Sequence, residues 1–314
     1  MPELPDIELY LHALRTRVQG AVLEHIRISQ PFLLRSVDPP LEAMFGRRVE
    51  GLSRLGKRIV TSLEQDYHLV LHLMIAGRLR WKDRGAPVSP RTGLATFEFS
   101  TGNLVLTEAG KKRRASLYAV EGRSSLAEHD PGGIDPLQCT VSEFGERLKL
   151  ENHTVKRALC DPTLFSGIGN AYSDEILHAA RMSPFKLTRE TNDAEVADLF
   201  DVVRETLAAW VSRLKEEAGE RFPAKITAFR PDMAVHGKYG QSCVACGSVV
   251  QRVVYAQNET NYCPVCQTGG RLLRDRALSR LLKSDWPRTP EELEEKRPGS
   301  GPSPPVDRSE VPTP

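Results

Sequence analysis

The sequence predicts an α+β protein with a β-rich N-terminal region, a helical middle region and a compact cysteine module near the C-terminus. Three observations indicate this class. Apolar residues recur at helical spacing from Ile7 to Val18, as in an amphipathic helix. From about residue 21 to residue 118, the pattern changes to short β-like runs that Gly, Pro and charged residues interrupt. Beyond residue 140, helical stretches lead to two Cys-x-x-Cys pairs.

The expected elements follow in chain order. The first helix, residues 6–18, should pack on the edge of the β-rich region. The clearest strands are Ile59–Leu63, His68–Leu73, Leu94–Phe99 and Leu104–Thr107. The Gly-, Ser- and Pro-rich segment from Glu121 to Pro136 predicts an interdomain linker. Helices should then cover residues 141–149, 154–160, 171–181 and 193–215.

Composition limits the class of protein. With 314 residues, the chain is long enough for two domains that each bury a core. It has 40% hydrophobic residues and no run of about 18 apolar residues, so we expect no transmembrane helix. The start, MPELPDIELY, carries acidic residues where a secretory signal needs a basic and then an apolar stretch. We therefore expect a cytoplasmic protein.

Charge is distributed unevenly along the chain, and the net charge of +2 hides this. Lys111–Arg114 is a basic run, and Arg271–Pro290 holds six basic and two acidic residues. We expect a basic amphipathic helix from Arg271 to Trp286 and a disordered, acidic tail from Glu291 onward. The basic stretches favour a nucleic-acid partner, although ordinary solvated surface charge explains them equally well on its own.

The cysteines predict one metal site. Cys243 and Cys246 form one pair, and Cys263 and Cys266 form a second pair after 16 intervening residues. Two pairs at this spacing bring four thiolates to one tetrahedral Zn2+ ion, which should be structural because the protein fills every ligand position. Disulfides are the alternative, and they suit oxidising compartments. The β-like run Val249–Tyr255 suits a small hairpin whose tip contacts a DNA backbone.

Two further features carry chemistry in combination. The turn Gly167–Asn170 precedes a helix, so Asn170 should be the N-cap, and the free N–H groups there suit a phosphate. A plain connection is the alternative. Pro2 follows Met1, whose removal a small second residue favours, and would then present a secondary amine that forms a cationic iminium with an aldehyde carbon. Glu3 is next to it and suited to move protons; otherwise Pro2 merely begins the chain.

Together these motifs resemble the Fpg/Nei family (formamidopyrimidine-DNA glycosylase and endonuclease VIII). MPELPD resembles the family's PELPE start, with Asp6 in place of the usual Glu. Leu55-Gly-Lys57 resembles its lysine-bearing hairpin, and His72–Gly77 its HLGMSG segment. Gly167–Tyr172 resembles its GVGNIY turn, and the zinc ribbon completes a likeness over roughly residues 1–267.

The resemblance implies a fold and a domain plan. By this resemblance, we expect the N-terminal region to be a β-sandwich with a helix and the middle region to be a helix-two-turn-helix domain. The implied divisions are 1–120 for the catalytic β-sandwich domain, 121–136 for the linker, 137–233 for the helix-two-turn-helix domain, 234–270 for the zinc ribbon, 271–290 for the basic helix and 291–314 for the disordered tail.

The resemblance also implies a base-excision-repair enzyme that is both a DNA glycosylase and an abasic-site lyase. Pro2 would attack C1′ of the damaged nucleotide, displace the base and form a Schiff base, and β- then δ-elimination would cut the strand. Glu3 would handle protons at the sugar, with Lys57 as the third residue of the catalytic group. Of the other matched residues, His72 and Asn170 would hold phosphates with Lys57, and Lys156 would lie near the damaged base.

The chain departs from the family pattern where that pattern contacts DNA. Ile75 stands where relatives insert a Met into the gap left by the everted base. The Arg and Phe that complete this wedge correspond to Arg113 and Ala115, so the aromatic partner is absent. Asn258 replaces a ribbon arginine and should grip phosphate less well. The short segment Ile226–Gly240 suggests a Nei-like preference for oxidised pyrimidines, single strands or abasic sites.

These departures leave a second hypothesis open, a non-catalytic or lyase-only paralogue that binds damaged or single-stranded DNA. A third hypothesis, an RNA-associated zinc-ribbon protein, explains the ribbon and the basic charge but gives the N-terminus no purpose. We expect a monomer, because a symmetric dimer would gain little at a single lesion.

Overall fold

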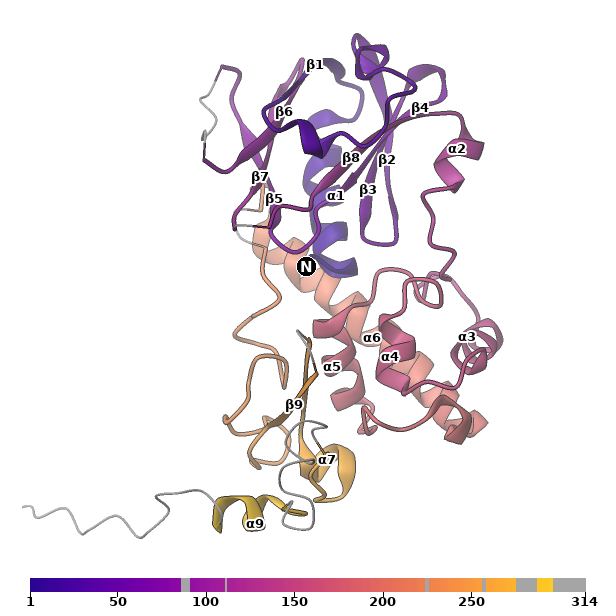
Figure 1. Cartoon of the computed structure of the whole chain (residues 1–314), viewed down its shortest axis with the longest axis vertical. Coiled ribbons are helices and arrows are strands. Elements are labelled where there is room, and N and C mark those ends of the chain that lie inside the picture. The colour runs from indigo at the N-terminus through magenta and orange to yellow at the C-terminus, as the bar shows by residue number, and fades with distance from the viewer. Residues whose placement is uncertain (86–90, 111, 224–225, 256–257, 275–286, 296–314) are drawn as a thin grey trace, which may run out of the picture.

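The computed structural model of the chain describes residues 1–85, 91–110, 112–223, 226–255, 258–274 and 287–295. Figure 1 shows a β-rich body above a helical body, with the small zinc ribbon at the lower end. The N-terminus lies between the two bodies, and this placement determines where the candidate site forms.

The N-terminal body begins with helix α1 (Leu4–Val18) and continues as an antiparallel sheet of order β5-β7-β6-β1-β2-β3-β4-β8. Strands β1 and β2 are joined through two residue pairs, Val22↔Arg48 and Leu23↔Arg47, so the sheet folds into two four-stranded layers. The strands are β1 (Val22–Ile28), β2 (Arg47–Leu55), β3 (Arg58–Leu63), β4 (Tyr67–His72), β5 (Gly77–Lys82), β6 (Gly93–Phe99), β7 (Gly102–Glu108) and β8 (Ser116–Glu121). The predicted β-sandwich is confirmed.

Helix α1 is more deeply buried than a helix on a sheet edge. Leu14 and Val18 line the same interior space as Ile59 and Leu71 of one layer and Phe97 of the other. Strands β2 and β3 cover one side of α1, and the long helix α6 (Asp193–Ala218) covers another. The helix therefore buries residues around most of its circumference, because the two bodies share one continuous hydrophobic core.

The helical body contains α3 (Val141–Lys149), α4 (Val155–Cys160), α5 (Asn170–Ala179) and α6, close to the predicted boundaries. Helix α6 packs against α1, α3 and α5 and runs from the helical body up to the sheet (Figure 1). The predicted linker is not wholly irregular, because a short helix, α2 (Arg123–Ala127), lies within it.

The C-terminal part is a ribbon of β9 (Gln251–Tyr255) and β10 (Asn258–Tyr262), followed by α7 (Pro264–Thr268). Residues 271–274 and 287–289, at the two ends of the predicted basic helix, are not helical, and residues 275–286 lie outside the described ranges. The predicted tail begins instead with a short helix, α9 (Pro290–Glu295), and its residues 296–314 are not described. Within the described part of the chain, no helix has the length and apolar character to cross a membrane.

Candidate active site

The carboxylate of Glu3 occupies the start of helix α5. Its Oε2 accepts the backbone N–H groups of Gly169 and Tyr172 at 2.8 and 3.1 Å, and its Oε1 accepts that of Ala171 at 2.9 Å. A helix start leaves N–H groups free and carries a partial positive charge, so a carboxylate is a favourable partner. The predicted side-chain N-cap at Asn170 is wrong, since the N-cap residue is Gly169. Glu3 takes three of the N–H groups at this turn, and the predicted phosphate contact there stays a prediction.

Gly169 lies where the carboxylate of Glu3, the ammonium group of Lys57 and the start of α5 meet. A Cβ at this position would lie 2.5 Å from Cδ of Glu3 and 2.7 Å from Nζ of Lys57. Lys57 comes from the turn between β2 and β3, where Gly56 has a φ of +58°. Only a residue without a side chain leaves room for the carboxylate and the ammonium group together. The sheet, the N-terminus and α5 therefore meet at one point.

A second glycine brings the N-terminal segment against the same turn. The carbonyl of Gly167 accepts the N–H of Leu4 at 2.9 Å. Gly167 has a φ of +85°, and a Cβ there would lie 2.8 Å from Cβ of Leu4. The chain therefore runs so close to the turn that Pro2, which is buried, and Glu3 have little freedom to move away.

The N-terminal amine lies in this environment. Burial lowers the pKa of the Met1 amine, Glu3 opposes this effect, and Arg78 and Lys57 lower the pKa further. A lowered pKa increases the neutral fraction of an amine near pH 7, and the neutral form is the nucleophile. The site is therefore electrostatically suited to an amine that attacks carbon.

His72 lies at the end of β4, opposite Arg58 in the sheet register. Burial lowers the pKa of His72 to about 4, and the positive charges of Arg58 and Lys57 act in the same direction. The imidazole is therefore neutral at pH 7, so the predicted phosphate contact would use it as a neutral hydrogen-bond donor.

Ile75 stands on a tight turn between β4 and β5, and 61% of it is exposed. The N–H of Gly77 donates to the carbonyl of Leu73 at 2.9 Å, and a Cβ on Gly77 would lie 2.2 Å from that carbonyl oxygen. Arg78 braces the turn from outside, because its Nη1 donates to the carbonyl of Ile75 at 3.1 Å. The turn, held by these two hydrogen bonds, thus exposes an apolar side chain to solvent.

Arg113 and Ala115, the predicted partners of Ile75 in the wedge, make their contacts elsewhere. The guanidinium of Arg113 donates to the carbonyl of Arg91. Ala115 has no exposed surface, and its N–H donates to Glu108 at 3.0 Å. Ala115 therefore belongs to the core of the sandwich and contributes nothing to a wedge at the surface.

Lys156, which the resemblance places near the damaged base, lies beneath the start of α5. Its Nζ is 2.5 Å from Oδ1 of Asp174, 2.9 Å from Oγ of Ser173 and 3.1 Å from the carbonyl of Asn170. Both Lys156 and Asp174 are buried. Three acceptors satisfy the ammonium group, which therefore stabilises the turn and is not available for DNA in this arrangement.

The ribbon hairpin contacts α5 directly. Nδ2 of Asn170 donates to the carbonyl of Glu259 on β10 at 2.8 Å. Arg252 on β9 pairs with Glu259 at 3.1 Å and stacks over the ring of Tyr239, 4.4 Å from its centroid. Asn258 is the first residue of β10, opposite Tyr255. Asn170 therefore joins the helical body to the ribbon, a partner that the sequence did not indicate.

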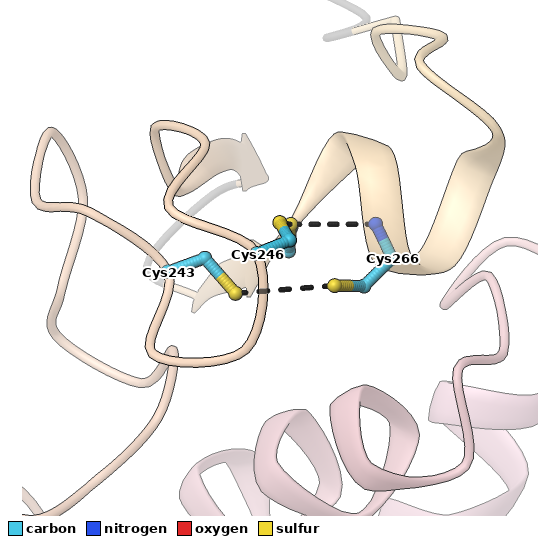
Figure 2. A group of neighbouring side chains, drawn as sticks. Cys243, Cys246 and Cys266 are labelled. Atoms are coloured by element: carbon cyan, nitrogen blue, oxygen red, sulfur yellow. Dashed lines mark hydrogen bonds between the residues drawn. The ribbon is translucent and has the colours of Figure 1, made fainter.

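The four predicted cysteines form one metal site. The sulfur atoms of Cys243, Cys246, Cys263 and Cys266 all lie within 4.8 Å of one another, and none of these cysteines is in a disulfide. Figure 2 shows the sulfur atoms of Cys243 and Cys266, 3.9 Å apart, directed toward each other. Thiolates around one tetrahedral zinc ion are about 3.8 Å apart, so the donor set and its spacing fit one structural zinc.

A histidine outside the ribbon also contacts this site. Nε2 of His178, on α5, is 3.2 Å from Sγ of Cys243, and both residues are buried. An N–H donor beside a metal-bound thiolate neutralises part of its charge and orients it. No sequence pattern indicates this contact, because His178 lies 65 positions before the cysteine.

Nothing in the sequence singles out Arg54, a half-buried arginine three positions before Lys57. Arg54 pairs with Glu8 at 3.0 Å and with Asp135 at 2.5 Å, and Nη1 donates to Oγ of Ser166 at 3.2 Å. These partners belong to α1, to the predicted linker and to the residue before Gly167. Arg54 therefore holds the lysine hairpin against the glycine turn.

Comparison with known proteins covers all three parts. Residues 1–115 match the model of the formamidopyrimidine-DNA glycosylase N-terminal domain, and residues 133–219 match that of the formamidopyrimidine-DNA glycosylase H2TH domain. Residues 240–269 match the zinc finger found in FPG and IleRS. The order of the three matches is the order of the sandwich, the helical body and the ribbon.

Similar proteins match over their full length. Formamidopyrimidine-DNA glycosylase of Roseiflexus sp. is 30% identical over 285 residues, which cover 85% of this chain and 100% of that protein. The enzyme of Lactococcus lactis subsp. cremoris is 28% identical over 276 residues, covering 85% and 99%. The structure of the Lactococcus lactis enzyme bound to DNA with an oxidized pyrimidine has a TM-score of 0.74 at 26% identity, covering 85% and 100%. Its complex with AP-site DNA has a TM-score of 0.73 at 25% identity, covering 85% and 99%.

Proposed function

The chain belongs to the formamidopyrimidine-DNA glycosylase family, and on this premise we propose that Pro2, freed of Met1, is the nucleophile that attacks damaged DNA. The protein is a base-excision-repair DNA glycosylase with DNA as its partner and one structural zinc. One observation carries the role of Pro2: Glu3 is anchored on α5, and this brings a carboxylate, Lys57 and the N-terminus together.

The proposed reaction uses the pyrrolidine nitrogen twice, as nucleophile and as electron sink. The nitrogen bonds to C1′, the glycosidic bond breaks, and the base leaves with the bonding electrons and takes a proton. Ring opening gives an iminium ion, whose formation acidifies the C2′ proton. Loss of that proton expels the 3′-phosphate, and loss of the C4′ proton then expels the 5′-phosphate. Glu3 takes and returns protons at the sugar.

The electrostatics of the site support this role. Burial lowers the pKa of the amine at the N-terminus, with Lys57 among the charges that act in the same direction. Pro2 is the neighbouring residue, so its amine, once free, would meet the same groups. A more neutral amine attacks faster near pH 7.

The same surroundings support a division of the DNA-contacting residues. We propose that Lys57 and the neutral His72 hold backbone phosphates and that Ile75 enters the gap left by the extruded nucleotide. Arg113 and Asn258 remain proposed DNA contacts on the basis of the family resemblance. Lys156 and Asn170 support the site indirectly, through the start of α5 and the ribbon.

Borohydride trapping tests the proposal. Protein without Met1 should form a covalent complex with abasic-site DNA in the presence of borohydride, which reduces the iminium. Protein with an N-terminal extension, in which Pro2 lies within a peptide bond, should bind the same DNA without being trapped. Protein with an equally long C-terminal extension is the matched control. Trapping of the N-terminally extended protein would contradict the assignment.

The lesion preference is a separate proposal. The short segment Ile226–Gly240 supports a preference for oxidised pyrimidines or abasic sites over 8-oxoguanine. Excision rates should be compared on duplexes that hold 8-oxoguanine, formamidopyrimidine, thymine glycol or an abasic site. A clear preference for 8-oxoguanine would contradict this proposal.

One observation favours the lyase-only alternative. The residue at the position of the family's aromatic partner is an alanine, Ala115, which is fully buried, so Ile75 must work without that partner. Cleavage of an existing abasic site requires no base removal, and in the same panel this alternative predicts strand cleavage at the abasic site alone.

We further propose that the enzyme works as a monomer in the cytoplasm, on the chromosomal DNA.

A further inference from the structure

The carboxylate of Asp6 is buried between the N-terminal segment and a distant arginine. Its Oδ2 accepts the backbone N–H of Glu3 at 3.0 Å, which closes the N-terminal cap of α1. Its Oδ1 lies 2.7 Å from Nη2 of Arg230. The side chains of Asp6 and Arg230 are 2% and 12% exposed. One carboxylate therefore ties the peptide next to Pro2 to a residue 224 positions away.

Arg230 stands on a segment that is held on both sides. Before it, Nε of Arg78 donates to the carbonyl of Ile226 at 2.8 Å. After it, the carboxylate of Glu175 accepts the backbone N–H groups of Ala234, Val235 and His236 at 2.7, 3.0 and 2.9 Å. Because both flanks are fixed to β5 and to α5, the guanidinium group has little freedom to withdraw from Asp6.

Tyr172 connects the same ion pair to the other side of the site. Its backbone N–H is one of the three donors to Glu3. Its hydroxyl and Nε of Arg230 are both buried without a hydrogen-bond partner. Burial raises the pKa of Tyr172, nearby Asp6 raises it further and Arg230 lowers it, so the phenol lies within reach of both charges. The charges of Asp6 and Arg230 together therefore influence the ionisation of the buried polar groups around Pro2.

We infer that Arg230 is a positioning residue for Pro2 and acts through Asp6. The inference rests on the proposed role of Pro2 as nucleophile. Asp6 stands where the resembled family start has a glutamate, and the shorter carboxylate here contacts Glu3 and Arg230 at once. The ion pair fixes the backbone that carries the amine and couples it to residues 226–240.

The physical consequence is specific to the chemical step. Without the guanidinium group, Asp6 would be a buried carboxylate without its counter-charge and would draw in water or a proton. The N–H of Glu3 would then lose its fixed acceptor, and the amine of Pro2 would leave its attack position. Phosphate contacts elsewhere on the protein would be unaffected, so the rate of imine formation should fall while DNA affinity is retained.

Single-turnover trapping with saturating abasic-site DNA tests this inference on the full-length protein without Met1. Arg230→Gln should form the trapped complex roughly 10- to 100-fold more slowly than the wild type, with DNA affinity unchanged. Arg230→Lys should recover part of the rate, because an ammonium group still pairs with Asp6. The double variant Asp6→Asn/Arg230→Gln should be no slower than the slower single variant, since both changes remove one interaction.

Arg213→Gln is the matched control, because Arg213 forms an exposed ion pair with Asp232 of the same segment at 3.5 Å. It should be trapped at the wild-type rate. A wild-type rate for Arg230→Gln, or additive losses in the double variant, would overturn the positioning role. If Arg230→Gln does not fold, the trapping rates of Arg230→Lys and Asp6→Glu decide in its place. Trapping of both variants at the wild-type rate would then overturn the positioning role. Failure of the wild type itself to be trapped would instead remove the proposed function.

Discussion

Oε1 of Glu3 lies 2.9 Å from the amide nitrogen of Ala171, so a side chain of the sandwich domain satisfies the helix start of the other domain. We predict that Glu3→Gln abolishes borohydride trapping and lowers the free energy of unfolding by about 1–3 kcal/mol, because an amide places N–H groups against N–H donors. Denaturant unfolding and trapping measure the two effects. Glu42→Gln, at an exposed position, should change neither, and unchanged stability of Glu3→Gln would contradict the role of this contact.

Gly169→Ala should separate the groups that meet at this point. Its Cβ would stand 2.5 Å from Cδ of Glu3 and 2.7 Å from Nζ of Lys57, so at least one of them must move. We expect strand cleavage at an abasic site to slow by about 100-fold, as for a misplacement of roughly 1 Å. Gly51→Ala is the control, because no atom lies within 4 Å of its added Cβ. Equal rates for the two variants would exclude tight packing of Glu3 and Lys57 against Gly169.

The low pKa of His72 predicts a pH dependence of stability. Its pKa is about 4 in the folded protein and 6.5 when unperturbed, so the unfolded chain binds the proton first as the pH falls. This residue's contribution to stability is therefore complete above pH 6.5, declines by up to about 3 kcal/mol as the pH falls to 4, and is constant below that. Unfolding of the wild type and of His72→Asn should be compared between pH 7 and pH 4. Parallel curves would show that the imidazole is not perturbed.

His178 should slow the loss of zinc. Its Nε2 lies 3.2 Å from Sγ of Cys243 and would donate to a zinc-bound thiolate, and removal of such a partner weakens metal binding about tenfold or more. We predict that His178→Phe releases zinc to a chromogenic chelator about tenfold faster than the wild type. His12→Phe, on α1, should release it at the wild-type rate. An unchanged rate for His178→Phe would mean that the contact is packing alone.

Ile75 should matter for base removal and little for cleavage of a site that already lacks its base. Its exposed side chain, on a turn braced by Arg78, is placed to fill the gap left by the extruded nucleotide. Ile75→Ala should slow excision of a damaged base from duplex DNA roughly tenfold. Val37→Ala, 91% exposed elsewhere, is the control. An equal loss on abasic and base-containing duplexes would argue against a wedge.

Local patterns predicted the elements well, because caps and periodicity depend on near neighbours. The expected helix at 193–215 lies within α6, whose start is fixed by a capping box of Asn192 and Glu195. The zinc ligands were predictable for the same reason, since each Cys-x-x-Cys pair specifies half of the site by itself. The short helices α2 in the expected linker and α9 at the start of the expected tail are local differences.

Contacts between distant residues could not be predicted. Free N–H groups after Gly167 attract any anion, and the sequence does not reveal that the anion is Glu3, 166 to 169 positions away. The sequence likewise does not reveal that Lys156 pairs with the buried Asp174. The Asp6–Arg230 pair is equally invisible, because neither residue belongs to a pattern that names the other.

The space shared by Glu3 and Gly169 also limits how this gene can recombine. The two residues belong to different domains, so a chimera that joins this sandwich to the helical domain of a relative inherits half of the contact from each parent. Such a chimera should be active only if the incoming domain supplies a side-chain-free residue and an open helix start at the same position. Domain exchange is thus restricted to partners that have kept the same fit, and the two domains are expected to have diverged together.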